Sequence, residues 1–207
     1  MAAAPRLIPR KTPSQQRSRQ TYEVILEAAA RVLETAGPAG FNTNAVAARA
    51  GVSVGSLYQY FPSKDALVAE LSRRGAQALL AALAEVVAEA PSASLQDDVR
   101  RLARAAIAWQ SARPALERAL DQLEEGLDLD TDARGTTRAI GDVIVRLLAP
   151  HLSGASTAQL REVAGDSLAL ARALIDRAVE RGDVNSPGFE SRLVGAICGY
   201  LDAVAEV

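Results

Sequence analysis

Residues 43–64 read TNAVAARAGVSVGSLYQYFPSK, and this stretch decides the fold of the chain. Asn42 or Thr43 can cap a short helix that ends before Gly51, and Ser53 can cap a second short helix that ends near Tyr60. Only a three-residue turn joins the two helices, so they cannot lie antiparallel. The stretch therefore predicts a steep crossing with helix-turn-helix geometry. Its predicted core consists of Val46, Ala47, Ala50, Val52, Leu57 and Phe61.

A longer helix is expected on each side of this stretch. Residues 16–36 carry apolar side chains at helical spacing, and Gly37-Pro38 ends that helix. Pro62 stops the second short helix, and Ser63 caps a fourth helix that starts near Lys64 and runs to residue 90.

Helical periodicity also fills the rest of the chain. Further helices are expected over residues 94–112, a shorter piece to 125, 131–152, 156–181 and 189–204. The fold class is therefore all-α, with an N-terminal three-helix helix-turn-helix domain and a larger C-terminal helical domain. The last two helices are apolar around more than one face, which indicates a second buried surface such as a partner subunit.

The charges are unevenly distributed along the chain. The formal net charge of the 207 residues is −2. Residues 1–74 nevertheless hold ten basic and five acidic side chains, a net charge of +5, and residues 75–207 therefore carry −7. A positive field surrounds the helix-turn-helix, as a DNA-binding surface requires.

The second short helix is suited to entering the major groove of DNA by its N-terminal end. Its first turn is small, and Gly55 allows the backbone to approach closely. Hydroxyl and ammonium donors for backbone phosphates flank it, at Thr43, Ser56, Tyr58, Tyr60 and Lys64.

These residues carry a resemblance to a known family. Ala-Gly-Val-Ser at 50–53, Leu-Tyr-Gln-Tyr-Phe at 57–61 and Lys64 closely resemble the N-terminal domain of the tetracycline-repressor (TetR/AcrR) family of bacterial transcription regulators. The match extends from about Arg17 to Leu67, roughly a quarter of the chain. The resemblance implies a homodimer that pairs through its last two helices, a small-molecule pocket in the C-terminal domain, and repression by most members.

The resemblance also implies which residues touch DNA: Thr43, Asn44, Val54, Gly55, Ser56, Tyr58, Gln59, Tyr60 and Lys64. Gln59, Asn44 and Ser56 are the main candidates for base edges, because an amide can pair bidentately with adenine. For Tyr60, a packing role and a DNA contact stay equally open.

The predicted domains are a flexible basic arm over 1–16, the DNA-binding domain over 17–63 and the effector-binding and dimerisation domain over 64–207. The arm is either a solvated tail or a minor-groove arm.

The C-terminal domain offers few candidate ligand-binding residues. Trp109 can line a cavity or belong to the core, and His151 is expected to interact with a helix C-terminus rather than a ligand. Cys198 is expected to be a small buried hydrophobe. Because aromatics make up only 4% of the chain, an aliphatic pocket that prefers an apolar ligand is expected.

The sequence gives no indication of catalysis, a metal or a cofactor. Asp128-x-Asp130-x-Asp132 begins like a calcium loop, but Ala133 and Ala139 occupy the positions of the required Gly and Glu. No nucleophile, base and orienting group occur at recognisable spacing. One cysteine and the lack of any secretory or membrane-spanning run favour the cytoplasm.

The sequence therefore predicts a DNA-binding transcriptional regulator, a repressor released from a palindromic operator by a small apolar ligand. Two alternatives stay open: a helical dimer that binds a ligand or partner and keeps a relic helix-turn-helix, and a constitutive DNA binder without an effector.

Overall fold

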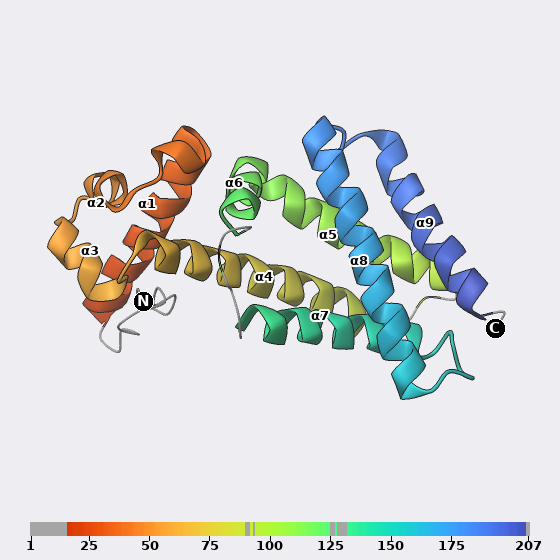
Figure 1. The fold of residues 1–207 in the computed structure, drawn as a ribbon. Helices are drawn as coiled ribbons and strands as arrows, with labels where there is room; N and C mark the ends of the chain where they lie inside the picture. Colours follow the sequence, from red (N-terminus) through yellow and green to blue (C-terminus); the bar gives the residue numbers. More distant parts are fainter. Residues whose placement is uncertain (1–15, 90–91, 93, 125–126, 128–131, 206–207) are drawn as a thin grey trace, which may run out of the picture. The chain divides into compact units, whose positions relative to one another are not determined.

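The computed structural model describes residues 16–89, 92, 94–124, 127 and 132–205, and every regular element among them is an α-helix (Figure 1). The predicted all-α fold is confirmed. The basic arm and the acidic Asp128–Asp132 stretch lie almost wholly outside the described residues. In the part of the chain that is described, no helix is long and apolar enough to cross a membrane.

The helices follow the predicted order with small differences at their ends. They are α1 (Gln16–Gly40), α2 (Thr43–Ala50), α3 (Val54–Tyr60), α4 (Lys64–Ala88), α5 (Leu95–Ala112), α6 (Pro114–Glu124), α7 (Asp132–Leu148), α8 (Thr157–Arg181) and α9 (Pro187–Ala205). The predicted end of the first helix is visible as a break inside α1, where Gly37 has a left-handed φ of 62°.

The described residues form two compact units. Met1–Gly75 with Arg113–Ala133 make up the head unit, and Ala76–Ala112 with Arg134–Val207 make up the body unit. Packing therefore divides the chain within α4 and assigns α6 to the head unit, whereas the predicted domain boundary follows residue 63. That boundary concerns function, and it stays a prediction.

The core of the head unit holds α3 in place. Leu57 and Phe61 are fully buried, together with Ile25 and Leu33 of α1 and Leu67 of α4. From α6, Leu116, Ala119 and Leu120 join the same core.

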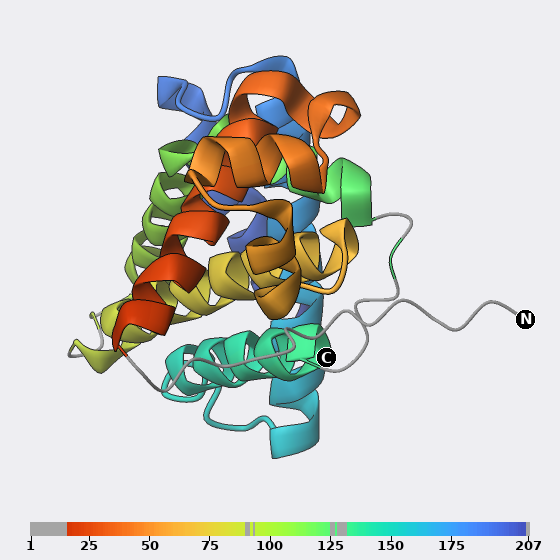
Figure 2. The same ribbon diagram turned by 90° about the vertical axis from the view of Figure 1, so that its left-hand side faces the viewer.

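Most of the core predicted for residues 43–64 is confirmed. Val46, Ala47, Leu57 and Phe61 are buried, and Ala50 and Val52 are half-buried and pack against them. Figure 2 views the head unit from the side that carries α2 and α3.

The core of the body unit is built by α5, α7, α8 and α9 with the end of α4. The predicted apolar stripe of α7 is confirmed, since Ile140, Val143, Ile144, Leu147 and Leu148 are all buried. They meet Ala164 and Ala178 of α8 and Phe189, Leu193 and Leu201 of α9 in one cluster.

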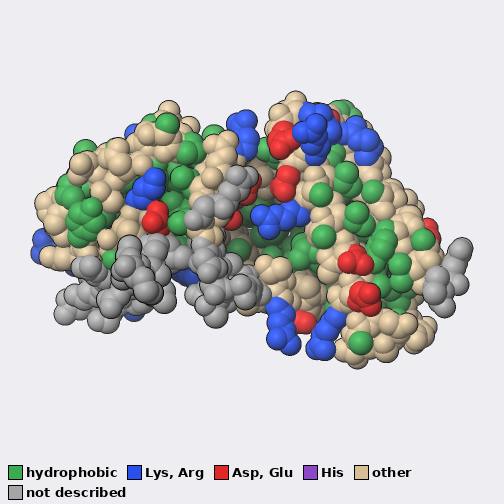
Figure 3. All heavy atoms as spheres, in the orientation of Figure 1, with side chains coloured by type: hydrophobic (Ala, Val, Ile, Leu, Met, Phe, Trp, Pro, Cys, Tyr) green, Lys and Arg blue, Asp and Glu red, His purple; other side chains and the backbone are tan. Residues whose placement is uncertain are grey.

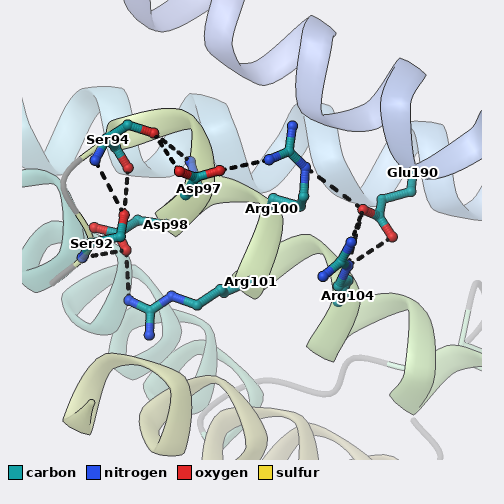
Figure 4. Close-up of polar contacts among 8 residues, drawn as sticks. All are labelled: Ser92, Ser94, Asp97, Asp98, Arg100, Arg101, Arg104 and Glu190. Atoms are coloured by element: carbon teal, nitrogen blue, oxygen red, sulfur yellow. Dashed lines mark hydrogen bonds and ion pairs between the residues drawn. The ribbon is translucent and has the colours of Figure 1, made fainter. Parts of the chain in front are cut away.

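A buried carboxylate links separate segments of the body unit. Asp98 of α5 is 1% exposed and accepts hydrogen bonds from Arg101 at 2.6 Å and from the Ser92 amide at 3.0 Å (Figure 4). His151 Nε2 lies 2.8 Å from its other oxygen. Burial alone would raise the pKa of Asp98, but the bonds from His151, Arg101 and Ser92 outweigh burial and hold the pKa well below its usual range. The sequence prediction for His151 missed this partner.

Replacing Asp98 with Asn should destabilise the protein by roughly 3 kcal/mol at pH 7, because it removes a buried negative charge that pairs with Arg101 and accepts a hydrogen bond from the Ser92 amide. A lowered carboxyl pKa contributes stability above the unfolded-state pKa of about 4 and loses it as the pH falls. The difference between wild type and Asp98→Asn in urea unfolding should therefore shrink between about pH 5 and 3.

The matched control is Asp97→Asn, which removes a carboxylate that is 58% exposed and pairs with Arg100. It should change the free energy of unfolding by less than about 1 kcal/mol. An equal effect of the two substitutions would show that Asp98 contributes no more than a surface carboxylate.

Candidate nucleic-acid interface

The turn between α2 and α3 depends on one left-handed residue. Gly51 has φ 67° and ψ 28°, and its amide donates to the carbonyls of Ala47 and Ala48 at the end of α2. The Val52 amide then donates to the Ala47 carbonyl at 3.1 Å. Because a left-handed residue with a side chain is strained, glycine is what allows α2 to end here and α3 to begin three residues later, at Val54.

Side-chain caps start both short helices. Asn42 accepts a hydrogen bond from the Ala45 amide at 2.9 Å, which selects Asn42 over Thr43 as the cap of α2. Ser53 accepts one from the Ser56 amide at 3.0 Å, as predicted for α3. The hydroxyls of Ser53 and Ser56 also lie 2.8 Å apart, so the Ser56 side chain already has a partner in the free protein.

The predicted DNA-binding residues fall into two groups by exposure. Asn44, Gly55, Tyr58, Gln59 and Lys64 are exposed. Thr43, Val54, Ser56 and Tyr60 are half-buried. A bond of 3.2 Å joins the hydroxyls of Thr43 and Tyr58, so the structure brings these two residues of α2 and α3 together. An exposed array of amide, hydroxyl and ammonium groups can meet both base edges and phosphates.

Two of the half-buried residues pack inside the head unit. Val54 lies against the head core. The Tyr60 ring makes an edge-on contact with Tyr22 at 6.2 Å, and its hydroxyl lies 3.1 Å from Ser18 Oγ of α1. Tyr60 thus fixes the end of α3 against α1, and whether it also touches DNA stays a prediction.

A charged cluster around one buried carboxylate, Glu70, was missed by the sequence prediction. Glu70 of α4 is 3% exposed and accepts hydrogen bonds from Arg73 at 2.6 Å and Arg74 at 3.0 Å. Arg74 also forms an ion pair with Glu23 of α1, and its guanidinium stacks on the Tyr22 ring at 5.4 Å. The spacing of Glu70 to Arg73 and Arg74 is visible in the sequence, whereas the contact with Glu23 depends on the fold.

The electrostatics of this cluster favour the ionised state of Glu70. Burial alone would raise its pKa, but hydrogen bonds from Arg73, Arg74 and Tyr22 outweigh burial and lower it. Burial and the Glu70 charge raise the pKa of Tyr22. The cluster therefore stays charged at neutral pH and ties α1 to α4 next to the end of α3.

The described residues contain no cluster of three or more His, Cys, Asp or Glu side chains that could hold a metal ion. The predicted ligand-binding residue, Trp109, is half-buried on α5 in the body unit. The exposed α2–α3 surface of the head unit is thus the candidate site that the described part of the chain defines best.

Comparisons with known proteins match both parts of the chain. Residues 25–71 match the family profile described as bacterial regulatory proteins, tetR family. Residues 94–201 match the profile described as the tetracyclin repressor-like C-terminal domain, and they make up more than half of the chain. No match was found among curated proteins.

Solved structures share the fold at low sequence identity. A putative transcriptional regulator from Pseudomonas aeruginosa PAO1 is 18% identical, with a TM-score of 0.72 and 93% of each chain covered. A TetR-family transcriptional regulator from Streptomyces coelicolor is 21% identical, with a TM-score of 0.68 and coverage of 90% of this chain and 98% of that one. The fatty acid degradation regulator FadR from Bacillus halodurans is 17% identical, with a TM-score of 0.67 and coverage of 89% and 97%.

Two glycine substitutions should have opposite effects on stability. A Cβ on either Gly51 or Gly55 would meet no atom closer than 3.9 Å, so neither substitution creates a clash. Gly51→Ala should nevertheless cost roughly 1–2 kcal/mol, because its φ of 67° strains a residue with a side chain. Gly55→Ala should be neutral or stabilise by up to about 1 kcal/mol, because alanine favours the helix. Thermal unfolding of both variants distinguishes the two effects, and a stable Gly51→Ala protein would contradict the role of the turn.

Proposed function

This chain belongs to the TetR family of bacterial regulatory proteins, and from that premise we propose that it is a repressor that leaves a palindromic operator when a small apolar ligand binds. The resemblance of residues 43–64 predicted the family correctly, and DNA-binding transcriptional regulation follows from membership. The repressor role, the form of the operator and the ligand belong to the proposal. So do the absence of catalytic activity and a cytoplasmic location, where the protein can reach its operator.

The exposed α2–α3 surface carries the proposal. Asn44 of α2, Tyr58 and Gln59 of α3 and Lys64 of α4 all reach solvent, and the three helices share one buried core. The net charge of +5 on residues 1–74 attracts a polyanion to this part of the chain.

The proposal assigns these residues different parts in DNA recognition. Gln59 and Asn44 reach base edges, with Ser56 doing so only if its bond to Ser53 opens. Lys64 and the joined hydroxyls of Thr43 and Tyr58 contact phosphates. Val54 and Gly55 offer apolar contact to a thymine methyl group, and Tyr60 acts mainly by holding α3.

A homodimer through α8 and α9 is the second part of the proposal. Gly195, Gly199 and Ala203 are exposed at a spacing of four residues along α9. A Cβ on either glycine would meet no atom within 4 Å in the single chain, so packing inside the chain does not require glycine there. Helical glycines cost stability, and close approach of a partner helix explains their presence.

Helix α8 also exposes small residues at a spacing of four. Gly165, Ala169 and Ala173 are exposed at the same spacing, and Leu170 is 37% exposed. Figure 3 shows apolar side chains between charged ones along the side of α8 that faces the viewer. Tyr200 of α9 donates a hydrogen bond of 2.5 Å to Asp166, which fixes α9 to α8 within each protomer. Two such helix pairs related by a twofold axis would cover both surfaces.

The ligand is proposed to bind in the body unit. Half-buried aliphatic side chains line its core from several helices, among them Leu79 and Leu80 of α4, Leu102 and Ile107 of α5, and Leu174 of α8. Such side chains favour an apolar ligand. Trp109 stays a candidate contact on α5.

Single substitutions can separate base contacts from phosphate contacts. Lys64→Gln should weaken binding to every duplex and reduce the slope of log affinity against log salt by about 1 for each head. Gln59→Ala should relax the preference at one base pair of each half-site, by about 1–3 kcal/mol, and leave the slope unchanged. Fluorescence anisotropy with duplexes selected from a random pool measures both effects.

Arg118→Gln is the charge-matched control, because Arg118 lies exposed on α6 and bonds to the Pro114 carbonyl. It should leave affinity and slope unchanged. A wild-type protein that binds no selected duplex would favour the relic alternative, and an operator complex that no apolar compound weakens would favour the constitutive binder.

Gly199→Leu should convert the dimer into a monomer, because the added side chain projects where the partner helix is proposed to approach. Sedimentation equilibrium should give twice the chain mass of 21.8 kDa for wild type and a single chain mass for the variant. Gly135→Leu is the control, because Gly135 is also a helical glycine with no atom within 4 Å of its Cβ position, but it lies on α7. A Gly199→Leu protein that remains dimeric would exclude this surface as the interface.

A further inference from the structure

One aromatic side chain of α1 contacts both residues at the end of α3. The Tyr22 ring lies edge-on to the Tyr60 ring, with 6.2 Å between the centroids, and tilted against the Phe61 ring at 4.9 Å. Tyr60 is the last residue of α3, and the Phe61 amide caps the helix by donating to the Leu57 carbonyl at 2.9 Å. All four residues belong to the head unit. Tyr22 therefore packs against the C-terminal end of the helix that is proposed to read DNA.

The two ends of α3 are held by different means. At the N-terminal end, Ser53 caps the helix by accepting a hydrogen bond from the Ser56 amide at 3.0 Å. Helix α2 ends at Gly51, whose amide donates to two carbonyls, whereas Phe61 has an extended backbone and donates to one. Because a helix of seven residues is not stable alone, its C-terminal end depends on contacts with other helices.

Two residues of α4 fix the Tyr22 ring in turn. The Tyr22 hydroxyl donates a hydrogen bond to Glu70, and both side chains are buried. The Arg74 guanidinium lies over the Tyr22 ring, 5.4 Å from its centroid. Glu70 is held by Arg73 at 2.6 Å and by Arg74 at 3.0 Å, so the carboxylate that accepts from Tyr22 is itself fixed. Because the hydroxyl and one face of the ring are both engaged, Tyr22 is a rigid support.

We propose that Tyr22 is a positioning residue for DNA recognition, because its ring holds the end of α3 in the orientation that presents Gln59 to a groove. This role rests on the proposed function, since the orientation of α3 matters for recognition only if α3 binds DNA. The ring contacts converge on Tyr60 and Phe61, which distinguishes Tyr22 from the aliphatic residues of the head core. A second contact with Tyr60, the hydroxyl bond of 3.1 Å to Ser18, comes from one turn earlier on α1.

Hydrogen exchange measures the support of α3 without DNA. The Leu57 amide donates to the Ser53 carbonyl at 3.0 Å, and the Phe61 amide donates to the Leu57 carbonyl at 2.9 Å. Tyr22→Leu removes the ring and the hydroxyl, so both amides should exchange at least about tenfold faster than in wild type, because α3 opens locally more often. Tyr22→Phe keeps the ring and loses only the bond to Glu70, so its exchange rates should lie between those of wild type and Tyr22→Leu.

Phe189→Leu is the matched control. Phe189 is a fully buried aromatic residue in the core of the body unit, so its substitution removes a ring from a core that does not contain α3. It should lower the midpoint of thermal unfolding, as Tyr22→Leu does. At a temperature well below both midpoints, it should leave the exchange of the two α3 amides unchanged. The comparison separates loss of support for α3 from loss of overall stability.

Binding to DNA tests whether this support matters for recognition. For Tyr22→Leu, the affinity for a selected duplex should fall at least about fivefold, because only molecules with α3 in place are competent to bind. The affinity for a duplex of random sequence depends mainly on charge and should change less than about twofold. The ratio of the two affinities, measured by fluorescence anisotropy, should therefore fall in Tyr22→Leu and stay at the wild-type value in Phe189→Leu.

The possible outcomes separate the role of Tyr22 from the proposed function. If wild type binds no selected duplex, the proposed function fails and the role of Tyr22 in recognition fails with it. If wild type binds, but folded Tyr22→Leu keeps either the wild-type exchange rates or the wild-type ratio of affinities, the role of Tyr22 alone is overturned. Should Tyr22→Leu fail to fold, Tyr22→Phe replaces it, and wild-type exchange of the two α3 amides in that variant would overturn the role.

Discussion

The structure depends on holding a helix that is too short to be stable alone. Helix α3 has seven residues, whereas isolated helices need more than about 12 to persist in water. It exists because Leu57 and Phe61 are fully buried against α1 and α4, and because Gly51 ends α2 with the single left-handed residue that the turn needs. These constraints leave Tyr58 and Gln59 exposed on a rigid surface, as recognition of a DNA groove requires.

Local signals predicted the helix-turn-helix well. Asn42, Ser53 and Ser63 all cap the helices that follow them, and Gly37 and Gly51 end helical segments with positive φ angles. Each of these features involves residues within a few positions of one another, so the sequence contains the whole interaction. The exposure of Gln59 and the burial of Leu57 follow from the same helical period.

Long-range polar contacts could not be predicted in the same way. His151 lies 53 residues from its partner Asp98, and Arg113 lies 79 residues from Glu34. Each arginine or carboxylate has many possible partners, and only the packing of apolar faces selects one. The packing of α6 in the head unit depends on the same kind of long-range selection, because Leu116 and Leu120 share a core with residues of α1 that lie far away in the sequence. The net charge of −2 was also uninformative until it was divided along the chain.

Two heads on a twofold dimer are the central claim, and a hydroxyl-radical footprint on a selected duplex tests it most directly. The account predicts two protected segments related by the twofold symmetry of the site, with centres about 34–36 Å apart or a multiple of that distance, because each α3 must enter a major groove on the same side of the helix. Protection of one segment alone, or of all sequences equally, would contradict the account.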